Sequence, residues 1–179
     1  MGVQEGGCHE PPTYPDSVGT KLKEESMDRP FVIENARERE RLRALVKRVT
    51  DEELNLPMEA GWTIASALAH LAFWDQRALI LMRKWKKSGV ALSPIDDDVT
   101  NDALLPLCLA ILPRVAAHLA VSAAEAIDRE LEEASDELIM AIENLGERFR
   151  LYRSDHRKVH LDQVETLLVM RRNIGRSTS

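Results

Sequence analysis

The fold is decided by residues 63–87, which read TIASALAHLAFWDQRALILMRKWKK. Apolar side chains recur here at the three- and four-residue spacing of an amphipathic helix. Thr63 precedes the pattern and is suited to cap its first turn, and basic side chains crowd the last turn, where they complement the helix dipole. With Gly89 placed to end it, the segment predicts one long helix with an apolar face.

Helical patterns also cover most of the remaining chain. Helices are predicted over about residues 30–49 and 152–172, and residues 101–148 are expected to be helical almost throughout, with a break near Pro113. Residues 132–137, EEASDE, fit either a polar helix face or a turn between two helices. Aromatic residues make up only 4 % of the chain, which also favours helix over sheet.

The two ends differ from this helical region. Residues 1–29 contain several Gly and Pro residues with little periodicity and predict a mobile tail, while residues 173–179 predict a frayed C-terminal tail. The domain organisation expected from the sequence is therefore one helical domain over residues 30–172 with a tail on each side.

Composition argues against several classes of partner. The 179 residues carry a net charge of −6, which gives no general attraction for nucleic acid or an anionic membrane. No apolar stretch has the roughly 20 residues of a membrane-spanning helix, and the N-terminus lacks the pattern of a signal peptide. Two cysteines are too few for a disulfide framework. We expect a cytoplasmic protein without nucleic-acid or membrane partners.

Three histidines carry the chemical information. His156 and His160 are four residues apart, so a helix places their side chains on one face, and both continue into the apolar stripe of that helix. His70 lies at the edge of the apolar stripe of residues 63–87 and can reach a groove between helices. Three imidazoles that meet can hold one divalent ion and leave coordination positions open, as a catalytic metal requires. The alternative is three unrelated histidines.

Other polar and aromatic residues near these histidines are weaker candidates for a role at the site. Gln163 could hydrogen-bond a ligand imidazole or bound water, or be an ordinary helix-surface amide. Asp155 is expected to be solvated or ion-paired, and Asp75 is expected to form an ion pair with Arg77 or another helix. The remaining candidates are Tyr152, which either donates a proton to the site or packs in the core, Trp62 and Trp74, which are expected to pack and could line a cleft, and His118, which we exclude as a ligand.

Two motifs in the right order resemble a known family. The first is the Gly61-Trp62-Thr63 turn followed by LAHLAFWD at residues 68–75, and the second is His156-x-x-x-His160 followed by LDQV. Together they resemble the DinB/YfiT-like superfamily, which includes mycothiol-dependent maleylpyruvate isomerases. The resemblance spans roughly residues 30–172 and implies an all-α, antiparallel four-helix bundle.

The resemblance also implies a function. It implies a divalent metal, zinc or nickel, held by His70, His156 and His160, a small-molecule substrate, and frequently a low-molecular-weight thiol and a homodimer. The expected activity is that of a metal-dependent S-transferase or hydrolase in which the metal activates a thiol or water. Family members often carry a carboxylate just before the second histidine of the late pair, where this chain has Val159, so no catalytic residue is assigned.

Three other functions are compatible with a helical chain that carries these histidines. The first is a metal- or ligand-binding bundle without catalysis, such as a stress-related or assembly protein, and the second is a helical interaction module without metal. A di-iron site is disfavoured because the chain lacks the Glu-x-x-His motifs that such sites use.

Overall fold

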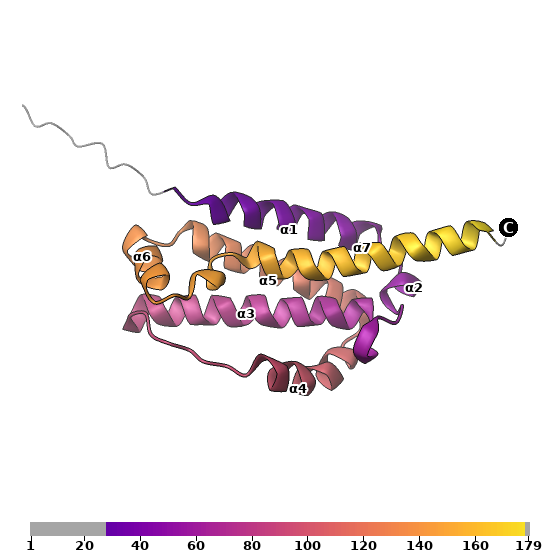
Figure 1. Ribbon diagram of the computed structural model, residues 1–179, viewed down its shortest axis with the longest axis horizontal. Helices are drawn as coiled ribbons and strands as arrows, with labels where there is room; N and C mark the ends of the chain where they lie inside the picture. Colours follow the sequence, from indigo (N-terminus) through magenta and orange to yellow (C-terminus); the bar gives the residue numbers. More distant parts are fainter. Residues whose placement is uncertain (1–27, 178–179) are drawn as a thin grey trace, which may run out of the picture.

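The computed structural model describes residues 28–177, which form seven α-helices and no β-strand. The predicted all-α fold is thus confirmed, whereas nearly all of the predicted N-terminal tail lies outside the described residues. The four long helices are α1 (Pro30–Arg48), α3 (Ile64–Ser88), α5 (Pro113–Glu132) and α7 (Arg153–Ser177) (Figure 1). The shorter elements are α2 (Asp51–Leu54), η1 (Glu59–Gly61), α4 (Asp97–Leu109), α6 (Asp136–Asn144) and η2 (Arg148–Arg150). Within residues 28–177, no helix combines the length and apolar character needed to cross a membrane.

Local side-chain chemistry explains where the helices begin and end. Thr63 and Ser66 form a reciprocal capping box at the start of α3, and Gly89 ends that helix with a positive φ of 82°. Pro113 occupies the first turn of α5, as its position in the sequence predicts. The alternatives for residues 132–137 are decided by Ser135, whose side chain caps α6, so this segment is a turn between two helices.

The last helix is longer than predicted. It continues to Ser177, beyond the expected end near residue 172. Arg172, just before this extension, forms an ion pair with Glu53, which ties the C-terminal part of α7 to the short helix α2. Figure 1 shows α7 projecting past the other long helices at this end.

The long helices form two parallel pairs that run antiparallel to each other. The cross-helix contacts that fix these directions are Asn35–Ser154 and Arg48–Glu165 for α1 with α7, Arg39–Asp128 and Arg43–Glu125 for α1 with α5, and His70–His156 and Asp75–Arg153 for α3 with α7. Helices α3 and α5 are parallel because α4 and its connections return the chain along the outside of α3 (Figure 1). The predicted antiparallel arrangement therefore holds between the pairs and not within each pair.

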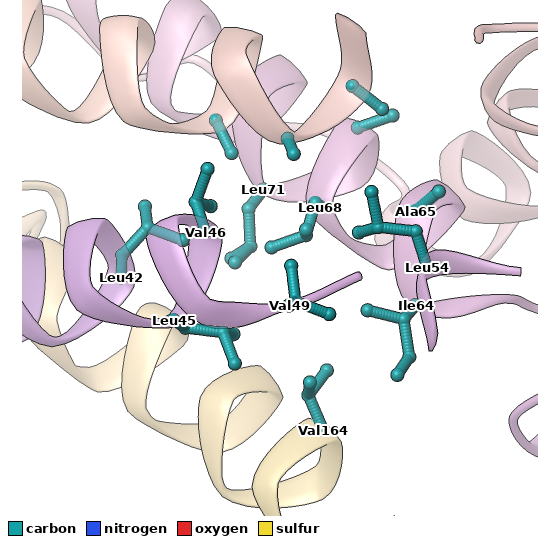
Figure 2. Packing of buried hydrophobic residues seen from close by; sticks show 14 of the residues in the cluster. Leu42, Leu45, Val46, Val49, Leu54, Ile64, Ala65, Leu68, Leu71 and Val164 are labelled. Carbon is teal, nitrogen blue, oxygen red and sulfur yellow. The ribbon is translucent and has the colours of Figure 1, made fainter. Parts of the chain in front are cut away.

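The core has two apolar regions, and a layer of buried polar side chains lies between them. Figure 2 shows the larger region, where α1, α3 and α7 contribute Leu42, Leu45, Val46, Val49, Leu68, Leu71 and Val164. The second region surrounds Met82, Trp85 and Ile127. Between them lie the buried polar side chains of Asn35, Asp75, Asp128 and Arg157. This polar layer adjoins the histidines.

Candidate metal centre

His70 reaches the candidate site from the middle of the first half of α3. Its side chain is buried, with 5 % of its surface exposed. The rings of Trp62 and Trp74 contact the imidazole edge to face, with centroid distances of 5.3 and 6.2 Å. These aromatic contacts restrict the rotation of the imidazole and keep water from two of its sides.

His156 and His160 reach the same place from α7. They are one helical turn apart, and both are half-buried. Their ring centroids lie 4.9 Å from each other and 5.1 and 4.8 Å, respectively, from the ring of His70. The structure thus brings together the three histidines that the sequence singled out, and their partial exposure leaves one side of the cluster open to solvent.

The spacing of the ring nitrogens fits a metal ion. One nitrogen from each ring lies within 4.8 Å of the others, and Nε2 of His70 is 3.1 Å from Nε2 of His156. Two nitrogens bound to one tetrahedral zinc at about 2.0–2.1 Å are about 3.3 Å apart. The His70–His156 separation already matches this value, and rotation of the half-buried His160 ring would close a larger gap. The three histidines could therefore hold a metal.

The surroundings keep the three imidazoles neutral. Burial, and secondarily the charge of His160, lowers the pKa of His70 to about 4. Burial, followed by the charge of Arg153, lowers the pKa of His156 to about 2. Burial also lowers the pKa of His160, although its bond to Gln163 opposes the shift. At neutral pH each ring therefore keeps a lone pair for a cation.

The second nitrogen of each ring has a different partner. Nδ1 of His160 lies 3.1 Å from Oε1 of Gln163, an acceptor that holds the proton on Nδ1 and leaves Nε2 for a metal. This contact agrees with the role considered for Gln163. Nδ1 of His156 lies 3.5 Å from Nη2 of Arg153, which is a donor. If His156 binds a metal through Nε2 as a neutral ring, its Nδ1 carries a proton, and the two donors must then move apart. Nδ1 of His70 is buried and has no partner within residues 28–177.

A buried ion network that the sequence patterns do not predict adjoins the histidines. Arg157 is fully buried and donates to Asp75 and Asp128 at 2.8–2.9 Å, and Arg153 donates to Asp75 at 2.8 Å. Burial opposes the charge on Arg157, yet the two carboxylates hold its pKa above the ordinary value. The predicted ion pair of Asp75 is made with α7 and not with Arg77. The sequence feature that could indicate this network is the four-residue spacing of Arg153 and Arg157, which is the same as the spacing of His156 and His160.

The other candidates lie away from the histidine cluster. Asp155 is exposed, and Tyr152 packs against Phe31 and accepts a hydrogen bond from Arg148. His118 is exposed on α5, although it lies on an apolar helical segment, where a histidine is more often buried in the core. Its exclusion as a ligand agrees with the structure, because the cluster found among the described residues contains His70, His156 and His160.

Comparison with known proteins gives one match. The sequence model described as the DinB superfamily matches residues 34–169, which is most of the chain and includes all three histidines. No curated protein and no solved structure shows significant similarity to the chain.

Proposed function

The chain belongs to the DinB superfamily, and on this premise we propose that it is a metal-dependent enzyme whose His70, His156 and His160 hold one divalent cation. The observation that carries the proposal is the approach of three ring nitrogens to within 4.8 Å, from two helices that are far apart in the sequence. Zinc and nickel are the proposed ions, since imidazole suits both and a three-histidine set does not discriminate strongly between them.

The proposed reaction is an S-transfer or a hydrolysis on a small electrophilic molecule. When bound, the metal would supply Lewis acidity and lower the pKa of a low-molecular-weight thiol or of water. The protein supplies position and environment. Gln163 fixes the tautomer of His160, and Trp62 and Trp74 restrict His70 and exclude water from its sides. Val159, in the position before His160, has an alkyl side chain and so provides no local base.

Metal content tests the first part of the proposal. After reconstitution with zinc or nickel, we expect about one equivalent in the wild-type protein and less than a tenth of that in His156→Ala. His118→Ala is the matched control because it removes an exposed histidine outside the cluster. Equal metal content in the three proteins would contradict the assignment.

Turnover tests the second part. A panel of small thiols is offered with a chlorinated aromatic acceptor, and formation of the thioether is followed with the metal-loaded wild type, His156→Ala and His118→Ala. The proposed transferase predicts activity that His156→Ala loses and His118→Ala keeps. Stoichiometric metal without turnover on these substrates or on activated esters would instead support a metal-binding bundle without catalysis.

The state of assembly is also a proposal. We propose a homodimer, and the support is a group of large apolar side chains that are 45–71 % exposed on α4, the first half of α5 and the connection between them, namely Val99, Leu107, Leu109, Leu112, Val115 and Leu119. Light scattering should give twice the chain mass of 20.2 kDa, and Leu107→Glu with Leu112→Glu should give a monomer, whereas Ile33→Glu should not. A wild-type monomer across the micromolar range would contradict the proposal.

A cytoplasmic location is likewise proposed. Its structural support is the buried free thiol of Cys108, which suits a reducing compartment. Cell fractionation tests it directly, and recovery of the protein outside the cytoplasm would contradict it.

A further inference from the structure

Arg77 is a half-buried arginine of α3 that lacks a carboxylate at ion-pair distance among residues 28–177. Its Nη2 donates to the carbonyl and hydroxyl oxygens of Ser93 at 3.2 and 3.1 Å, and its guanidinium lies 5.8 Å from the ring centroid of Trp74. Its Nη1 is buried and has no hydrogen-bond partner in the same residues. A buried donor on a cation is costly when it is left unpaired, so Arg77 is suited to receive an anion.

Among the described residues, the neighbouring arginines have carboxylate partners that Arg77 lacks. Arg153 and Arg157 are neutralised by buried aspartates, and Arg150 donates to Glu147 at 2.9 Å. Arg77 has no such contact within residues 28–177. The charges of Arg150 and Arg153 oppose its own charge, while Asp97 and Glu147 favour it without forming an ion pair. Burial, and after it the charge of Arg150, lowers the pKa of Arg77 below the ordinary value. Because none of these carboxylates pairs with Arg77, its buried Nη1 keeps a donor for an anionic ligand.

Arg77 is aligned with the histidine cluster along α3. His70, Trp74 and Arg77 are separated by four and three residues, so they share one face of the helix. Seven residues correspond to about 10 Å along the helix axis. Trp74 joins the two ends of this row, since its indole contacts both His70 and the guanidinium of Arg77.

A matching row lies opposite, along the start of α7. Because α7 runs antiparallel to α3, its residues proceed from His156 to Arg153 in the same direction as α3 proceeds from His70 to Arg77. Arg150, in η2, comes one turn earlier still, and its Nη2 donates at 3.4 Å to the Ser93 carbonyl that also binds Arg77. Both rows therefore begin at the histidines and end at arginines.

We propose that Arg77, assisted by Ser93 and Arg150, binds a carboxylate of the small molecule whose reactive atom lies at the histidine cluster, about 10 Å away. A planar carboxylate suits a guanidinium that has one donor still available beside a serine hydroxyl. The proposal extends the proposed function, because it predicts that one of the two reacting molecules, thiol or electrophile, carries a carboxylate at this distance. Binding of the anion itself does not require the metal.

The experiment measures carboxylate binding by the metal-free protein. Succinate and uncharged succinamide are titrated at constant ionic strength, and binding is followed by tryptophan fluorescence and by the melting temperature, since Trp74 lies beside Arg77. We expect succinate to bind, succinamide not to bind, and Arg77→Gln to weaken succinate at least about tenfold. Arg77→Lys should bind weakly, because lysine keeps the charge and loses the planar fork. Arg83→Gln should bind like the wild type, because Arg83 lies on the same helix as Arg77 but is paired with Glu130 of α5.

The outcomes separate this inference from the proposed function. His156→Ala should lose the metal and keep succinate binding. Failure of the wild type to bind succinate, equal binding by a folded Arg77→Gln, or an equal response to chloride would overturn the carboxylate site and leave the metal proposal standing. If metal does not bind and succinate does, the metal proposal fails alone. Circular dichroism confirms that Arg77→Gln is folded, which is expected because no ion pair is removed.

Discussion

At the scale of single residues, the histidine cluster depends on imidazoles that stay neutral. Burial lowers the pKa of all three rings, and the charge of Arg153 contributes further at His156. Each ring therefore keeps a lone pair over a wider pH range than an exposed histidine would. In the metal-free protein, the same burial makes the cluster a source of acid sensitivity.

The first prediction concerns this acid sensitivity. The pKa of His156 is about 2 in the folded chain and near 6.5 when unfolded, so below pH 6.5 the unfolded chain binds a proton that the folded chain does not. Stability is therefore lost as pH falls below 6.5. Between pH 6.5 and 5, the free energy of unfolding of metal-free wild type should fall by up to about 2 kcal/mol more than that of His156→Gln.

Urea titrations at the two pH values measure this difference. Carboxylates also titrate in this range, but they are common to both proteins and cancel in the comparison. His118→Gln should follow the wild type because His118 is exposed. Equal losses of stability in wild type and His156→Gln would refute the prediction.

Gln163 gives the second prediction at this scale. Its Oε1 is the acceptor for Nδ1 of His160, so Gln163→Leu should leave that ring free to adopt the wrong tautomer or orientation. Metal affinity should fall about 10- to 100-fold, as is usual for loss of such a partner. Competition with a chromogenic chelator measures it. Thr166→Ala, an exposed change one turn further along α7, should have no effect, and an unchanged affinity in Gln163→Leu would show that the contact does not orient the ligand.

The residues that the sequence identified are those with local spacing. Two histidines four apart, and a glutamine three residues later, are one helical turn apart on any helix. Arg153 and Arg157 have the same kind of spacing, but their role depends on Asp75, which lies on α3 about 80 positions earlier in the chain. Arginines on a helix are usually solvated, so the spacing alone did not reveal that these two are buried.

At the scale of elements, one buried side of α7 carries two sets of polar side chains. It carries His156 and His160 toward α3, and it carries the buried Arg153 and Arg157 toward the carboxylates of α3 and α5. A shift of α7 along α3 would separate these arginines from the buried carboxylates and leave those carboxylates unpaired. The ion pairs therefore fix the register of α7 against α3. The distance between His70 and the α7 histidines therefore depends on the ion network beside them.

Asp75 is the residue at which the third prediction tests this dependence. Asp75→Asn leaves two buried guanidiniums short of an acceptor, so it should lower the free energy of unfolding by about 3–5 kcal/mol. Asp162→Asn is the matched control, because Asp162 forms partly exposed pairs with Arg41 and Lys158 and its loss should cost much less. Chemical denaturation measures both, and equal effects would contradict the proposed importance of the buried pair.

The ends of the elements show what local chemistry can predict. Thr63, Pro113 and Gly89 act where their chemistry places them, because a cap or a fixed φ depends on a few neighbours. The boundary at Glu132 was ambiguous because the same polar residues suit an exposed helix face and a turn. The residues after position 172 predict a frayed tail from their composition, whereas α7 continues to Ser177.

At the scale of the whole molecule, the topology joins the histidines across the two helix pairs. One pair is α1 with α7 and the other is α3 with α5, and the cluster takes His70 from one pair and His156 and His160 from the other. The sequence predicted a helical bundle from its patterns and resemblance, but not the parallel direction within each pair. That direction depends on α4 crossing outside α3, which no local pattern encodes.

The last prediction follows from this bridging position. A metal that binds α3 and α7 together is bound by the folded chain and not by separated helices, so it should stabilise the whole bundle. At a metal concentration 100 times the Kd, the gain is about 2.7 kcal/mol, which for a chain of this size corresponds to a rise in Tm of roughly 5–10 °C. Thermal melts with zinc and with nickel measure it. The rise should vanish in His70→Ala, which removes the ligand of the α3–α5 pair, and in His160→Ala, which removes a ligand of the α1–α7 pair. It should persist in His118→Ala. A rise that survives in His70→Ala would mean that the metal binds α7 alone and does not join the two pairs.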